Sequence, residues 1–146
     1  MNLYTIGFTQ KSAKEFFDLI KSHNIDLLID IRLNNVSQLA GFAKGKDLEF
    51  FLKEICNCKY AHDDVFSPTK ELLDNYRAKK VSWGEYEEVF ARIMVDRQIE
   101  NRFKNLYNGC ENVCLLCTEP TAEKCHRRLV AEYLQEHLNN IEVSHI

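Results

Sequence analysis

The sequence of 146 residues lacks several features that would assign it at once to a familiar class. Its hydrophobic residues occur in short runs broken by charges, and none approaches the roughly 20 residues that a membrane-crossing helix needs. Residues 1–8, MNLYTIGF, have neither the basic segment nor the long apolar stretch of a secretory signal peptide. We therefore expect a cytoplasmic protein with no membrane partner.

An excess of basic residues is also missing. The chain has 19 Lys and Arg against 22 Asp and Glu, which gives a formal net charge of -3. Broad binding to a nucleic-acid backbone usually requires a basic face, so the composition argues against it. A small anionic molecule or a nucleotide-like ligand stays compatible with this charge. The oligomeric state does not follow from the composition.

Common catalytic motifs are absent as well. There is no glycine-rich phosphate loop, no GxSxG elbow and no HxE followed by PCxxC. Cys110, Cys117 and Cys125 are not followed six positions later by arginine, which excludes the usual phosphatase or sulfurtransferase loop. No repeat, low-complexity tract or linker divides the chain. Its length suits one domain, residues 1–146, with one site.

Hydrophobic periodicity predicts alternating strands and helices. Predicted strands cover residues 3–9, 25–32, 58–65, 111–117 and 141–146. Predicted helices start at the capping boxes of Ser12 and Ser82, at Thr69 and near residues 48 and 122. The alternation predicts an α/β fold, a single compact domain with a mostly parallel sheet flanked by helices. Residues 33–47 carry Gly41 and Gly45 without a period, so they are interpreted as a loop, either a surface connection or a lid.

Polar residues follow three of the predicted strands. Gly7 and Thr9 end the first strand, Asp30 and Arg32 end the second, and Cys117 with Glu119 ends the fourth. Ligands of open parallel sheets usually bind beyond the carboxyl ends of the strands. We therefore expect one pocket there, provided that the three strands lie close together.

Asp30 and Arg32 are two positions apart, so on a strand their side chains leave the same face. Two interpretations stay open. The carboxylate and guanidinium can pair with each other as a structural ion pair, or they can bind a polar ligand together.

The cysteines Cys114 and Cys117 have the spacing of half a zinc site. On a strand, however, residues three apart point to opposite faces, so both cannot easily hold one ion and Cys114 is expected in the core. A metal held by Cys117, Glu119, Cys125 and His126 is chemically feasible, although adjacent ligands at 125 and 126 would need unusual backbone geometry. A metal-free site is favoured, and no cofactor is predicted.

Helical phase orients the segment after Cys117. A stripe of apolar positions along the last helix places His126 near its centre and Cys125 and Arg127 at its edges, while Arg128 points away. This pattern favours Cys117 or Cys125 as a thiolate, His126 as a proton carrier and Arg127 as an anion anchor. The structural alternative is two core cysteines, a histidine bonded to a carbonyl group, and arginines that solvate a helix.

Several segments together resemble the Domain of Unknown Function 488 family over almost the whole chain. They are TIGFT, DIRLNNVSQ, Tyr60, SPTKELLDNY, SWGEYEEVF and LLCTEPTAEKCHR. The resemblance implies a compact α/β domain and a site at the matching positions, which are Asp30, Arg32, Ser37, Cys117, Glu119, Cys125, His126 and Arg127. This chain differs from the family pattern at Phe8, Thr9, Asn35 and Gln38, where the family often has histidine, serine, proline and arginine.

These observations predict a small enzyme whose polar, anionic substrate binds at the strand ends, with a nucleotide or nucleic-acid-derived molecule as one class. The expected catalytic residues are Asp30, Cys117, Glu119, Cys125 and His126. The expected substrate-binding residues are Gly7, Thr9, Arg32, Ser37 and Arg127. The alternatives are a non-catalytic module that binds a ligand or associates with nucleic acid, and a structural Cys/His metal site.

Overall fold

Five parallel strands form the centre of the molecule. The computed structural model describes residues 1–36 and 40–146, and its single sheet has the strand order β3-β2-β4-β1-β5. Every strand pair is parallel, so the predicted sheet is confirmed and has no antiparallel strand among the described residues. The strands are β1 (Asn2–Gly7), β2 (Leu27–Asp30), β3 (Lys59–His62), β4 (Asn112–Cys117) and β5 (Glu142–His145).

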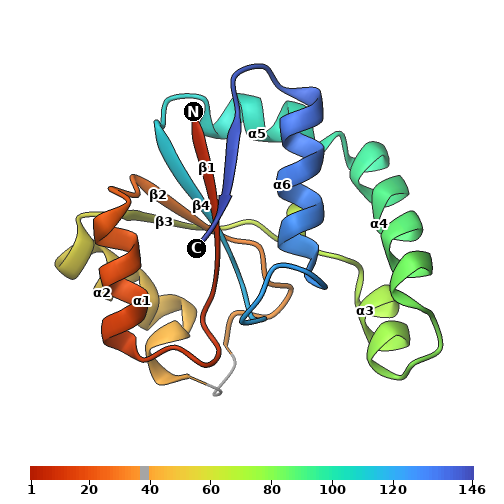
Figure 1. Ribbon diagram of the computed structural model, residues 1–146, viewed down its shortest axis with the longest axis horizontal. Coiled ribbons are helices and arrows are strands. Elements are labelled where there is room, and N and C mark those ends of the chain that lie inside the picture. The colour runs from red at the N-terminus through yellow and green to blue at the C-terminus, as the bar shows by residue number, and fades with distance from the viewer. Residues whose placement is uncertain (37–39) are drawn as a thin grey trace.

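Helices cover both faces of the sheet and give three layers (Figure 1). They are α1 (Ala13–Ser22), α2 (Gly45–Cys56), α3 (Lys70–Arg77), α4 (Trp83–Arg97), α5 (Ile99–Tyr107) and α6 (His126–His137), with short 3-10 turns at Gly41–Ala43 and Asp64–Phe66. The capping boxes of Ser12 and Ser82 begin α1 and α4 as predicted. Within the described ranges, no helix has the length and hydrophobicity required to span a membrane.

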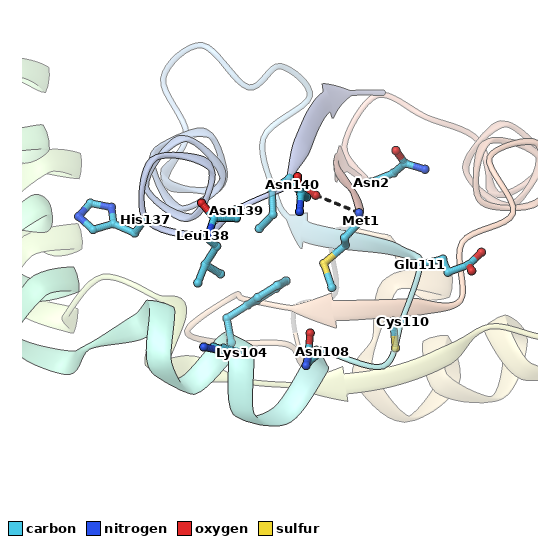
Figure 2. A pocket seen from close by; sticks show the side chains of 12 residues that line it. Met1, Asn2, Lys104, Asn108, Cys110, Glu111, His137, Leu138, Asn139 and Asn140 are labelled. Carbon is cyan, nitrogen blue, oxygen red and sulfur yellow. Dashed lines mark hydrogen bonds between the residues drawn. The ribbon is translucent and has the colours of Figure 1, made fainter.

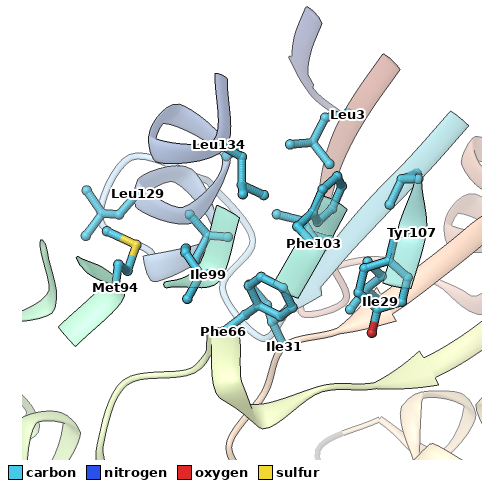
Figure 3. Packing of buried hydrophobic residues seen from close by; sticks show 14 of the residues in the cluster. Leu3, Ile29, Ile31, Phe66, Met94, Ile99, Phe103, Tyr107, Leu129 and Leu134 are labelled. Carbon is cyan, nitrogen blue, oxygen red and sulfur yellow. The ribbon is translucent and has the colours of Figure 1, made fainter. Parts of the chain in front are cut away.

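The core consists of two apolar clusters, one on each face of the sheet. Leu3, Ile29 and Leu115 pack against α4, α5 and α6, and Figure 3 shows part of this cluster around Phe103 and Leu134. The opposite cluster joins strand residues to α1 and α2 and contains Cys114, which is fully buried as expected. Alternation along β4 therefore places Cys117 on the α6 face, away from Cys114.

Three helices differ from the predictions, and one of them is α6, which begins at His126 and not near residue 122. Helix α2 begins at Gly45, so part of the expected loop 33–47 is helical. A Cβ atom at Gly45 would lie 2.5 Å from the Asn35 side chain, so this glycine permits close packing and does not mark a loop. Helix α5 was not predicted, because Gln98 in the left-handed conformation ends α4 and starts α5 without a glycine or proline.

The sheet has a topological switch point between β1 and β4. The chain leaves β1 for β2, on one side of this neighbouring pair, and leaves β4 for β5, on the other side. Connections that diverge in this way open a crevice at the carboxyl ends of the strands. The strands that carry the predicted site residues, β2, β4 and β1, are consecutive in the sheet, as a single pocket requires.

Candidate functional site

A pocket of about 530 Å³ lies at the carboxyl ends of β2 and β4. Its volume is within the roughly 300–1,000 Å³ typical of small-molecule sites. Five of the predicted site residues line it: Arg32, Cys117, Glu119, Cys125 and His126. Helices α3 and α4 supply much of the remaining wall. The strand ends and the first turn of α6 thus meet around one space.

A second, larger hollow of about 640 Å³ lies at the opposite end of the sheet (Figure 2). The amino group of Met1 there donates a hydrogen bond to the carbonyl of Asn140. The buried residues that line this hollow, Phe103 and Ile141, are apolar, and its charged side chains are exposed. The candidate site is therefore the smaller pocket, whose lining includes the buried side chains of Cys117, Cys125 and His126.

Cys117 and His126 form a thiol–imidazole pair in this pocket. The Cys117 sulfur lies 3.5 Å from His126 Nδ1, and His126 Nε2 lies 3.0 Å from the carbonyl oxygen of Ile31. Because a carbonyl oxygen only accepts, Nε2 must carry a proton, and Nδ1 is then the nitrogen that exchanges a proton with sulfur. The ring of Phe90 meets the imidazole edge to face and helps to fix its orientation. A thiol, an imidazole and a carbonyl acceptor are therefore in contact, as in sites where a base activates a nucleophile.

The backbone of Cys125 brings a second sulfur to the same point. Cys125 is extended, with φ -135° and ψ 140°, and is the N-cap residue that precedes α6. The change from extended to helical backbone lets the adjacent side chains of Cys125 and His126 converge without unusual geometry. The expectation that such convergence needs an unusual backbone was wrong, because it assumed that the helix starts at residue 122.

The surroundings of Cys117 favour its thiolate. A hydrogen bond from Cys125 lowers the pKa of Cys117, and although burial opposes this effect, the backbone N–H groups of Thr118 and Glu119 and the charge of Arg127 support it. The pKa of Cys125 is raised by the same hydrogen bond and by burial. Of the two cysteines, Cys117 therefore has the lower pKa and loses its proton more readily.

Arg127 is buried behind this pair, with 1% of its surface exposed. Its guanidinium donates to the Glu119 carbonyl and the Thr5 hydroxyl, and lies 3.8 Å from the sulfur of Cys125. It makes no ion pair with a carboxylate in the described part of the chain. The positive charge of Arg127 is one of the causes that lower the pKa of Cys117. Arg127 does not line the pocket, so the structure gives no contact by which it would bind a substrate in the way that the sequence predicted.

Asp30 and Arg32 pair with each other. Arg32 donates through Nε and Nη2 to the two carboxylate oxygens at 2.8 and 2.6 Å, and through Nη2 to the Ala43 carbonyl. The Tyr60 hydroxyl also donates to Asp30, which is completely buried. Within the described residues, Nη1 of Arg32 is the one buried side-chain nitrogen or oxygen without a hydrogen-bond partner. Asp30 thus holds Arg32 in place, and Nη1 is left as a buried donor without a hydrogen-bond partner.

Four predicted site residues remain, namely Gly7, Thr9, Ser37 and Glu119. The Glu119 side chain is exposed at the pocket, whereas Thr9 donates its hydroxyl hydrogen bond to the Thr118 carbonyl and does not line the pocket. Gly7 packs under the loop that follows β4. Ser37 lies outside the described residues.

Gly7 is expected to be essential to the position of this loop. A Cβ atom at residue 7 would lie 1.7 Å from the carbonyl oxygen of Glu119, the acceptor of the Arg127 hydrogen bond. Gly7→Ala should therefore lower the free energy of unfolding by about 3 kcal/mol, because the loop must move. Urea denaturation measures this change. Gly109→Ala is the matched control, since nothing lies within 4 Å of its added Cβ, and equal effects of the two variants would contradict the close-packing role.

The sequence interpretation missed an aromatic wall of the pocket. Tyr76 from α3 and Trp83 and Tyr86 from α4 line the space beside Cys117 and His126. Trp83 is the first residue of α4, and its position in the sequence alone does not indicate a pocket. A usable signal was present, since these three aromatic residues lie in two of the segments that carry the family resemblance.

The site could also hold a metal ion. The sulfurs of Cys117 and Cys125 and a ring nitrogen of His126 lie within 4.8 Å of one another, and all three residues are buried. Such sulfur and nitrogen donors suit zinc, which prefers four ligands. The protein supplies three such donors in the described ranges.

Fold and site together define a parallel α/β protein with a buried thiol–imidazole pair at the carboxyl ends of its strands. The chain belongs to the family described as Domain of unknown function DUF488, whose match spans residues 12–134. This range includes the site from Asp30 to Arg127 and leaves Gly7 and Thr9 outside. No curated protein and no solved structure matches the chain.

Proposed function

We propose that this protein is a cytoplasmic thiol-dependent enzyme that acts on a small anionic substrate. The observation that carries the proposal is the Cys117–His126 pair, oriented by the Ile31 carbonyl, in a pocket that is also lined by Arg32, whose Nη1 has no hydrogen-bond partner. The pair provides a nucleophile and a proton carrier, and Arg32 provides a positive charge for an anionic group. Nine-tenths or more of each of these side chains is buried, so water is largely displaced around the reacting groups.

The reaction proceeds in two balanced steps. The Cys117 thiolate forms a bond to an electrophilic atom of the substrate while the bond to the leaving group breaks. The leaving group takes the bonding electron pair and the proton held on Nδ1 of His126. Water then attacks the same atom and returns a proton to Nδ1. The bond to sulfur breaks and its electron pair regenerates the thiolate.

A metal centre is the second candidate. It is supported by the convergence of Cys117, Cys125 and His126, which contain three donor atoms suited to zinc. Elemental analysis of protein purified without an affinity tag separates the two proposals. About one zinc per chain would favour the metal centre, whereas a metal-free preparation that retains turnover would leave the thiol mechanism.

Alkylation of Cys117 tests the thiolate directly. Because its folded-state pKa is lowered, the thiolate should persist below the ordinary cysteine pKa of 9.0, and the rate of reaction with iodoacetamide should fall only at lower pH. Peptide mass spectrometry at each pH gives this rate for every cysteine. Buried Cys58, whose pKa is raised to about 12, is the internal control and should react appreciably only in strong base.

The hydrogen bond from Cys125, which lowers the pKa of Cys117, can be tested with a variant. Cys125→Ala removes the largest contribution that lowers the pKa of Cys117, so its alkylation midpoint should move to higher pH. A Cys117 midpoint at or above 9 in the unmodified protein would contradict the thiolate. A non-catalytic binding module would show the same alkylation profile without any substrate turnover.

A further inference from the structure

We propose that the pocket binds a nucleoside monophosphate, with the nucleobase against Trp83 and Tyr76 and the phosphate near Arg32. This inference names the substrate class of the thiol-dependent enzyme and in that respect rests on the proposed function. The observations that carry it are the aromatic wall, the distribution of charge around the pocket and the buried donor without a partner.

The aromatic wall is a compact group of three rings. Trp83 stacks on Tyr86 with ring centroids 4.9 Å apart and planes 16° apart, and Tyr76 lies 5.5 Å from Trp83. Tyr86 is almost fully buried and supports the other two from behind. Trp83 and Tyr76 line the pocket and are only half-buried, so both retain surface for a ligand. Rigid aromatic surfaces of this kind bind nucleobases by stacking.

The cations suit one phosphate group. Arg77 and Lys124 line the pocket, are exposed, and make no ion pair within the described residues. Arg32 is held rigidly by Asp30 and retains a buried Nη1 without a partner. Negative charge on a ligand in the pocket would be attracted by the charge of Arg32 and by the exposed cations.

The size of the pocket and the net charge of the protein favour a free mononucleotide over a nucleic-acid chain as the ligand. The pocket volume of about 530 Å³ suits a small molecule. The formal net charge of -3 does not favour extended contact with a polyanion. A nucleotide at the end of an oligonucleotide has the same local chemistry, so the experiment includes it as a separate ligand.

Tryptophan fluorescence reports this binding directly, because Trp83 is the single tryptophan of the chain. Adenosine and guanosine 5′-monophosphate should quench its emission and reach saturation. Ribose 5-phosphate, which lacks the base, should not quench it, and adenosine, which lacks the phosphate, should bind more weakly. An oligonucleotide that binds more tightly than either mononucleotide would overturn the choice of a free nucleotide.

Variants separate the contribution of the aromatic wall to mononucleotide binding from the contribution of the exposed cations. Tyr76→Leu should weaken mononucleotide binding about tenfold, as expected for the loss of a stacking surface. The exposed pair Arg77→Gln and Lys124→Gln should weaken it about fivefold without disturbing the fold, and added salt should diminish that difference. Tyr133→Leu is the aromatic control, since Tyr133 stacks on His137 and does not line the pocket.

A further variant separates this inference from the proposed function. Cys117→Ser removes the nucleophile but leaves the aromatic wall, so it should still bind the mononucleotide. Binding by this variant together with no turnover by the unmodified enzyme would support the ligand and contradict the thiol mechanism. If the protein turns over an anion that has no nucleobase, and neither mononucleotide quenches the fluorescence, the nucleotide site is wrong. The proposal of a thiol-dependent enzyme would then still stand.

Discussion

Cys117→Ser should reduce turnover by about a thousandfold or more while the protein stays folded. Serine has nearly the shape of cysteine, but its hydroxyl stays protonated at neutral pH and is a much weaker nucleophile. The hydrogen bond of His126 to Ile31 and the buried Arg127 do not depend on sulfur for their position. The loss should therefore appear in kcat with little change in substrate binding.

The substrate for this assay comes from the protein itself. Mass spectrometry of small molecules that copurify with the unmodified protein, and that are absent from Arg32→Ala and His126→Ala, identifies candidates for turnover measurements. Cys110→Ser is the matched control, because Cys110 is half-buried and lies in the hollow at the opposite end of the sheet. If Cys125→Ser abolishes turnover and Cys117→Ser does not, the nucleophile is Cys125.

Much of the fold follows from local patterns in the sequence. The apolar run of β4 and the capping boxes of α1 and α4 are signals that depend on a few neighbouring residues, and the structure confirms them. Such signals do not reveal long-range packing. Gly45 begins α2, and the lack of a side chain there lets Asn35 and Tyr60 approach, which are ten and fifteen positions away in the sequence.

The candidate site shows the same limit. Strand alternation and helical phase correctly placed Cys114 in the core and turned His126 towards the sheet, because both depend on a fixed period. The aromatic wall could not be placed in this way. It requires α3 and α4 to fold over the ends of β2 and β4, a contact between segments more than thirty residues apart.

Asp30 and Arg32 form the structural ion pair, and Arg32 also lines the pocket, as the ligand-binding interpretation requires. Arg32 uses Nε and Nη2 on Asp30 and the Ala43 carbonyl, as in the structural interpretation, yet it also lines the pocket with Nη1 unpartnered. Asp30 is fully buried and does not line the pocket. The arrangement therefore favours Asp30 as a positioning residue for Arg32, and its catalytic role stays a prediction.

Asp30→Asn should lower the free energy of unfolding by about 3–5 kcal/mol, because it leaves the buried guanidinium of Arg32 without its counterion. Asparagine has the size of aspartate, so the change removes charge with little loss of packing. Urea denaturation measures the effect. Asp18→Asn, which breaks the exposed ion pair with Lys14, is the control and should leave the midpoint almost unchanged.

The double variant Asp30→Asn with Arg32→Met decides the cause. If the destabilisation arises from an uncompensated buried charge, removing that charge as well should restore much of the lost stability. Because the double variant also lacks the ligand donor, it should remain unable to bind the anion. Full stability of Asp30→Asn alone, combined with lost turnover, would instead assign Asp30 a direct part in the reaction, since only a role in holding Arg32 predicts that stability and binding fall together.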